Sequence, residues 1–119
     1  MAVSQEYLDY IMDQLRSFGP VRTRRMFGGA GLYLQDVFFG LIADDVLYLK
    51  VDDSNRNDYL SRDMGPFRPF GSYEMSYYEV PVDVLEDPDD LAQWAKKSMT
   101  IAASTKRPSR RSAVRGKKK

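Results

Sequence analysis

The sequence has 119 residues, of which 43% are hydrophobic, and its formal net charge is +1. This length allows one compact domain with a modest core. The chain contains no Cys and no His, which excludes disulfides and thiolate chemistry and removes the commonest general base and divalent-metal ligand.

The N-terminal segment predicts an amphipathic helix from about Gln5 to Ser17. Ser4 is suited to cap it, because its hydroxyl can accept from a free backbone N–H of the first turn. Gly19-Pro20 supplies the stop signal, since Pro cannot continue a helix. The buried stripe, at i, i+3, i+4, i+7 spacing, is formed by Leu8, Ile11, Met12, Leu15 and Phe18.

Four segments rich in β-branched and aromatic residues then predict a β-meander. Gln35-Asp36 and Asp44-Asp45 separate the last three segments and have the length of tight hairpin turns. Asp tolerates positive φ only moderately well, so the turn type stays open. The predicted strands are Val21–Phe27, Ala30–Leu34, Val37–Ala43 and Val46–Val51.

The second half of the chain predicts a further helix, loop and strand. Asp52-Asp53-Ser54 offers caps for a helix that reaches about Asp63, with a thin apolar stripe of Tyr59, Leu60 and Met64. Met64–Gly71 holds two Pro and two Gly and predicts a loop or a short irregular edge strand. Tyr73–Val80 alternates as a strand does, with Tyr77 and Tyr78 on opposite faces.

The last helix has the clearest start signal. Asp87 is its predicted cap, Pro88 its first residue, and Asp89 and Asp90 meet the positive end of the helix dipole. We expect Trp94 to be mostly buried and to anchor this helix to the sheet. The inward stripe is Leu91, Trp94, Ala95, Ser98, Met99 and Ala102.

This order of elements predicts an α+β fold with two layers, an antiparallel sheet with helices on one face. The expected order is one helix, three or four strands, a helix, one or two strands and a last helix. We expect one domain over residues 1–105 and a disordered basic tail over residues 106–119, because the tail has almost nothing to bury.

The charge is divided between these two parts. The first 105 residues hold all seventeen acidic and ten of the eighteen basic side chains, a net charge of −7. The tail's cations are attracted to polyanions by electrostatics alone, which predicts weak, non-specific nucleic-acid binding; the alternative is a solvated extension. The tail cations are Lys106, Arg107, Arg110, Arg111, Arg115, Lys117, Lys118 and Lys119.

Three patterns that can carry chemistry are better explained by local structure. The Gly28–Gly31 run lies between strands and lacks the helix that a phosphate loop opens, so it predicts a bulge or a close backbone crossing. Tyr77-Tyr78 could stack on bases, but its own segment has no basic residue, so core packing is favoured. The paired carboxylates at Asp44-Asp45, Asp52-Asp53, Glu86-Asp87 and Asp89-Asp90 stand at turns and caps. We therefore predict no catalytic, cofactor-binding or metal-binding residue.

Two segments are candidates for a partner surface. Arg22 and Arg24 share a strand face and Arg25 lies opposite; they could contact phosphate or an acidic partner, or guard a sheet edge against pairing. In the loop that follows the second helix, Phe67, Arg68 and Phe70 form either an aromatic docking patch or a lid on the core.

Several motifs resemble the TfoX N-terminal domain family. The resemblance rests on Arg24–Leu34, which includes the sequence RRMFGGAGLYL, on Val37–Asp53, on Met64–Pro69 and on Met75–Pro81. It covers roughly Gln5 to Ala103. It implies an α+β domain and a role in transcription regulation; family members tied to competence act with the cyclic-AMP receptor protein at bacterial promoters. Those members usually carry a second C-terminal domain, where this sequence continues into the basic tail.

The first functional hypothesis is therefore a non-enzymatic regulatory module that acts through protein partners, with nucleic-acid affinity added by the tail. The alternatives are a small-molecule-binding domain and a plain protein-interaction domain unrelated to competence. The longest apolar run, Val37–Ala43, is too short to span a bilayer, and the acidic N-terminal segment does not resemble a secretory signal. We expect a cytoplasmic protein, and the sequence leaves its oligomeric state open.

Overall fold

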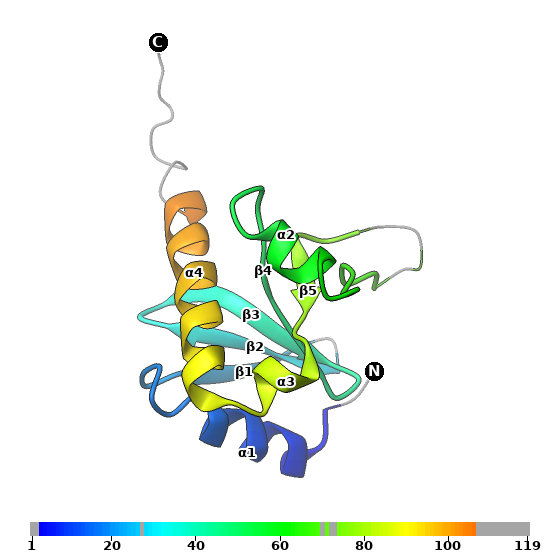
Figure 1. Ribbon diagram of the computed structural model, residues 1–119. Helices are drawn as coiled ribbons and strands as arrows, with labels where there is room; N and C mark the ends of the chain where they lie inside the picture. Colours follow the sequence, from blue (N-terminus) through cyan, green and yellow to red (C-terminus); the bar gives the residue numbers. More distant parts are fainter. Residues whose placement is uncertain (1–2, 27, 70, 72–73, 107–119) are drawn as a thin grey trace.

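The computed structural model describes residues 3–26, 28–69, 71 and 74–106, and the side chains among them up to residue 104. Figure 1 shows how the elements are arranged. In chain order they are α1 (Gln5–Gln14), β1 (Arg22–Met26), β2 (Gly29–Leu34), β3 (Val37–Ala43), β4 (Val46–Lys50), α2 (Arg56–Leu60), β5 (Tyr77–Glu79), α3 (Val82–Leu85) and α4 (Pro88–Lys106).

The strands form one antiparallel sheet in the order β1-β2-β3-β4-β5. The predicted meander is confirmed, and β1 to β4 each begin and end within one residue of the expected positions. Both hairpin turns have positive φ at their two central residues, 53° and 65° at Gln35 and Asp36 and 56° at both Asp44 and Asp45. Two successive positive φ angles define a type I′ turn, whose twist matches that of the strands it joins.

The Gly28–Gly31 segment lies where the backbone is most crowded. A Cβ atom added to Gly29 would lie 2.3 Å from the backbone oxygen of Ile42, and one added to Gly31 would lie 2.8 Å from Phe38 Cε1. Gly28 itself has φ of 79°, which L-residues with side chains rarely adopt. The prediction of a close backbone crossing is confirmed. A phosphate loop would lead into a helix, whereas this segment leads into strand β2.

Two helices are shorter than predicted. α1 begins after Ser4, whose Oγ accepts from Tyr7 N as expected, but it ends at Gln14 because residues 15–18 form tighter turns, with Phe18 N donating to Leu15 O. α2 begins only at Arg56 because the Asp52 carboxylate accepts hydrogen bonds from Ser54 N and Oγ, which holds this segment in a turn.

The region between α2 and α4 differs most from expectation. β5 covers Tyr77–Glu79 and not the predicted Tyr73–Val80, because its partner β4 turns away after Val51; residue 73 lies outside the described residues. The predicted irregular edge is confirmed, since Phe67 N donates to Tyr77 O at 2.7 Å. The short helix α3 was not predicted, and its Val84 is buried.

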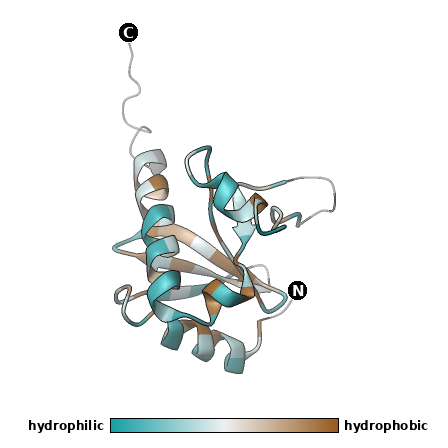
Figure 2. Ribbon diagram, viewed as in Figure 1, coloured by the Kyte–Doolittle hydropathy of each residue, from teal (hydrophilic) through white to brown (hydrophobic). Residues whose placement is uncertain are grey.

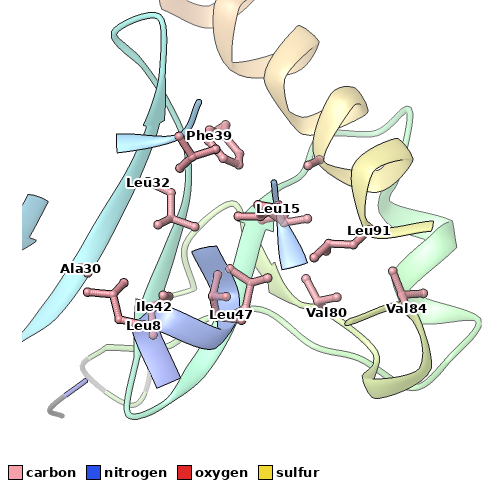
Figure 3. Packing of buried hydrophobic residues seen from close by; sticks show 14 of the residues in the cluster. Leu8, Leu15, Ala30, Leu32, Phe39, Ile42, Leu47, Val80, Val84 and Leu91 are labelled. Carbon is pink, nitrogen blue, oxygen red and sulfur yellow. The ribbon is translucent and has the colours of Figure 1, made fainter. Parts of the chain in front are cut away.

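One hydrophobic core lies between the sheet and the helices (Figure 3). Strand residues alternate, so that Leu32, Ile42 and Leu47 face this core from three neighbouring strands. Leu15 follows α1 and Leu91 lies on α4; both pack against the same side. The expected two-layer α+β fold with helices on one face is confirmed. Figure 2 shows the contrast between the mostly hydrophobic central strands and the hydrophilic residues along the helices.

The last helix begins as predicted but docks differently. Asp87 Oδ1 accepts from Asp89 N at 3.1 Å and from Asp90 N at 3.3 Å. Trp94, however, is only partly buried. Its ring packs edge-on against Tyr59 of α2, with ring centroids 4.7 Å apart, so it joins α4 to α2. Leu91, Ala95 and Ser98 of the same stripe take the fully buried positions.

We predict that Gly29→Ala destabilises the fold by about 1–3 kcal/mol, the usual cost of overpacking a tight site. The reason is the contact between the new Cβ atom and the backbone of Ile42, which no rotamer change can relieve. Gly65→Ala is the matched control, since no atom lies within 4 Å of its added Cβ. Urea unfolding measures the change in the free energy of unfolding for each variant. An equally small change at the two positions would contradict the explanation by crowding.

We also predict that Trp94→Ala lowers the free energy of unfolding by about 3 kcal/mol, the low end for a truncated aromatic, because the ring is partly exposed. Tyr59→Phe should change it by less than about 1 kcal/mol. Among the described residues the buried Tyr59 hydroxyl makes no hydrogen bond of good geometry, and its interaction with the nearby Ser98 Oγ, which donates to Lys50 O, is at most weak. A large loss for Tyr59→Phe would reveal a hydrogen bond to this hydroxyl.

Candidate nucleic-acid and partner interface

The three predicted arginines lie on β1, an edge strand of the sheet. The expected division between faces is confirmed. Arg25 turns toward the helix side, where its guanidinium donates to Val3 O at 3.4 Å and to Gln5 Oε1 at 3.3 Å. Arg22 and Arg24 face the other side, opposite Tyr33 and Gly31 on β2. This placement fits protection of a sheet edge, but it also leaves two cations together on a face that has no helix.

A shallow depression of about 560 Å³ lies at this point of the sheet, lined by Arg22, Thr23, Arg24, Tyr33 and Asp36. Arg22 forms an ion pair with Asp36 at 3.2 Å, and both side chains are about three-quarters exposed. Exposed pairs of this kind contribute little stability. Arg22 is therefore available to a stronger anion without a large loss to the fold.

The loop after α2 lies on the helix-free side as well. The Phe67 ring packs on Tyr48, with ring centroids 4.8 Å apart, and Arg68 pairs with Glu74 at 2.6 Å. Phe67 therefore covers the outer side of the sheet and is not a lid on the main core. Phe70, the third residue of this candidate patch, lies outside the described residues.

The side of the sheet opposite the helices, here called the open face, carries a row of aromatic and cationic residues. Arg22 stands opposite Tyr33, and Tyr33 opposite Phe38, in the register of β1, β2 and β3. The rings of Tyr33 and Phe38 lie 5.2 Å apart, and those of Phe38 and Tyr77 5.5 Å. Lys50 Nζ lies 5.0 Å from the Tyr77 ring centroid. The row crosses the sheet from β1 to β5.

The residues of this row are not equally accessible. Tyr77 is buried beneath its neighbours, with 7% of its surface exposed, whereas Tyr33, Phe38 and Lys50 are partly exposed. Burial raises the pKa of Tyr77 to about 12, and the nearby Tyr33 adds to the shift. Tyr77 thus supports the row from below, and Tyr33 and Phe38 form its surface.

Tyr33, Phe38 and Lys50 were missed by the sequence analysis. Base stacking by Tyr77 was rejected because no cation occurs in its own segment. The cation comes from β4 instead, where Lys50 is the register partner of Tyr77. Strand alternation predicts which residues of each strand share a face. To find the site, one must also know which strands pair and in what register, and the sequence does not give this.

A second depression lies on the helix side and is lined by Ser54, Gln93, Trp94, Lys96, Lys97, Thr100 and Ile101, with a volume of about 570 Å³. Lys97, one of its lining residues, pairs through Nζ with Asp58 Oδ2 at 2.9 Å. This ion pair and the Trp94–Tyr59 contact both join α4 to α2. The depression thus lies along α4, beside the turn at Ser54 that precedes α2.

Of the predicted tail cations, the structure places only the backbone of Lys106, at the end of α4. Its side chain and the rest of the tail, Arg107 to Lys119, lie outside the described residues. Within the described part of the chain, no group of three or more acidic residues is arranged to hold a metal ion. None of the helices found there combines the length and apolar character needed to cross a membrane.

Comparison with known families gives one match. The model of the TfoX N-terminal domain matches residues 13–102 of this chain, most of the described fold and the whole open face. None of the curated proteins compared matches the chain.

We predict that stability falls between pH 10 and pH 12 in part through buried tyrosines. Burial raises the pKa of Tyr7 and of Tyr77 to about 12 in the folded chain, from an ordinary value of 10.0. The unfolded chain therefore loses these protons at a lower pH than the folded chain. The contribution of the protonated, buried tyrosines to the free energy of unfolding is complete below pH 10 and is lost as the pH rises toward 12. Urea unfolding across this range should show a weaker decline for Tyr77→Phe; an unchanged decline would contradict the assignment to Tyr77.

Proposed function

Because this chain belongs to the TfoX N-terminal domain family, we propose that it is a non-enzymatic regulatory module of transcription that acts through a protein partner, with nucleic-acid affinity added by its basic tail. The observation that carries the proposal is the family match over residues 13–102. We further propose that it works in the cytoplasm, where such partners and nucleic acid meet.

The side-chain chemistry supports a binding role. A sequence without His and Cys must rely on Tyr, carboxylates, Arg and Lys for any catalysis. The paired carboxylates occupy structural positions: Asp44 and Asp45 form a hairpin turn, Asp52 accepts from Ser54, and Asp87 caps α4. Each has a backbone role that accounts for its presence, so a catalytic role is not needed to explain it.

The division of charge suggests how the two parts share the work. The tail holds eight cations and no acid, while residues 1–105 carry a net charge of −7. The tail is suited to polyanions, and the acidic domain is suited to a basic protein surface. Such an arrangement can bring a protein partner to nucleic acid without sequence-specific contacts of its own.

We predict that the full chain binds a 20-base-pair duplex weakly and without sequence preference. Each phosphate contact contributes roughly −0.9 to the log–log salt slope, so full use of the tail would give about −7. The acidic domain repels part of the duplex, and we expect a slope of about −3 to −5. Fluorescence anisotropy at several salt concentrations measures both affinity and slope.

The control replaces the eight tail cations, Lys106, Arg107, Arg110, Arg111, Arg115 and Lys117–Lys119, by Gln in the full chain. This variant should lose nearly all duplex binding, whereas Arg24→Ala combined with Arg25→Ala should lose little. The reverse result would place duplex binding on β1. For the protein partner, capture from a bacterial lysate with and without nuclease separates contacts made by the domain from those bridged by nucleic acid.

A further inference from the structure

We propose that the open face binds single-stranded nucleic acid, with bases stacking on Tyr33 and Phe38 and phosphates contacting Arg22, Arg24 and Lys50. This goes beyond the proposed function, in which the tail alone supplies nucleic-acid affinity. It does not depend on that function, because a base-stacking site on the domain can exist whether or not the tail is used.

The aromatic geometry is that of a stacking platform. Ring atoms of Phe38 and Tyr33 occupy the space above Gly31, since a Cβ there would lie 2.8 Å and 3.2 Å from their Cε1 atoms. The two rings thus lean over the strand beside Met26, whose Cε would lie 2.9 Å from the same Cβ, and both aromatic residues are partly exposed. Protein domains that stack bases on a sheet use aromatic residues of neighbouring central strands in this way.

The charge of the open face differs from that of the rest of the domain. By alternation and register, its strand residues include three cations, Arg22, Arg24 and Lys50, and one carboxylate, Glu79. Asp36, in the turn beside it, pairs with Arg22 and adds a second carboxylate. The first 105 residues as a whole carry a net charge of −7. A small local excess of cations on an acidic domain, next to partly exposed aromatic residues, matches a ligand that is both anionic and aromatic.

The dimensions fit a short single strand. Arg22 and Lys50 lie at the two sides of the row, on β1 and β4. Neighbouring strands are about 4.8 Å apart, so the row spans roughly 14 Å between these two cations. Two or three bases, the number stacked by comparable sheets, can lie between them. A rigid duplex hides its base faces and cannot use Tyr33 or Phe38.

The test compares a labelled dT12 single strand with a 12-base-pair duplex, using the full chain at physiological salt. Tyr33→Ala should weaken single-strand binding by about fivefold or more, as expected when one stacking ring is removed. Duplex binding should change by less than about twofold, because the tail is untouched. Tyr10→Ala is the matched control: Tyr10 is 39% exposed on α1, away from the open face, and its replacement should alter neither affinity.

A second pair of variants tests the cations. Arg24→Gln and Arg25→Gln remove the same charge from adjacent residues that face opposite sides of β1. Arg24→Gln should weaken single-strand binding by about threefold more than Arg25→Gln, if one phosphate contact is lost. Equal effects would mean that only net charge matters, which would overturn the proposal while leaving tail-based duplex binding intact.

A further measurement protects the test against misfolded variants. In the wild-type chain, the ring proton signals of Tyr33 and Phe38 should shift when dT12 is added and should shift several-fold less when inorganic polyphosphate is added; equal shifts with the two ligands would overturn the proposal. Polyphosphate carries the charge but has no bases, so it can pair with the cations of the tail and of the open face without stacking on the rings. Shifts with neither ligand, or a polyglutamate peptide that binds the open face more tightly than dT12, would overturn the proposal.

Discussion

The arrangement of the sheet depends on one extra residue in β3. The register of β2 and β3 pairs Leu32 with Gly40 and then Tyr33 with Phe38, so Phe39 has no partner of its own. A bulge of this kind reverses the side-chain alternation beyond it. Phe39 is consequently buried in the core against Phe18, at a ring distance of 5.3 Å. Phe38 is turned to the opposite side, where it meets Tyr33.

This bulge explains why both faces of the sheet contain aromatic residues although only one is covered. The helices bury Leu32, Ile42 and Leu47 on one side. On the other side, Phe38 and Tyr77 pack on each other, and Lys50 lies over the Tyr77 ring. Apolar surface that no helix covers must gain its stability from such lateral contacts, and the same contacts hold the rings in fixed positions. A rigid row of this kind can bind a flat ligand at a low cost in conformational entropy.

The two charged regions of the chain suggest different roles in one activity. A basic segment without acids gains affinity from the density of phosphate charge, which is highest in a duplex. Exposed ring faces gain affinity only from unpaired bases. Under the two binding proposals, the balance between these features would set the preference of the protein for single-stranded or duplex nucleic acid. Such a preference suits a regulator that acts where strands are separated.

The sequence by itself determined the class of fold, the family and most element boundaries. Local signals were sufficient to place these elements. Ser4 and Asp87 cap their helices, and the turns at Asp36 and Asp45 have the length that hairpins need. The crowded position of Gly29 was also predictable, because a glycine run between two strands usually marks a place where a side chain would not fit. The limits of α2 and β5 were not predictable. The start of α2 depends on which local hydrogen bonds Asp52 makes, here with Ser54. The limit of β5 depends on the bond between Val51 N and Ser76 O, which are far apart in the sequence.

Only the tertiary structure decided the content of the open face. Tyr33, Phe38 and Lys50 come from three strands, and each looks ordinary in its own segment. The bulge at Phe39 changes which face Phe38 occupies, and nothing in the local sequence marks it. The contact of Trp94 with Tyr59 was also missed, because it joins two helices and nothing in the sequence of either helix marks it. Local propensity fixes where elements begin and end, but the face on which a side chain lies depends on strand register, which is set by all paired strands together.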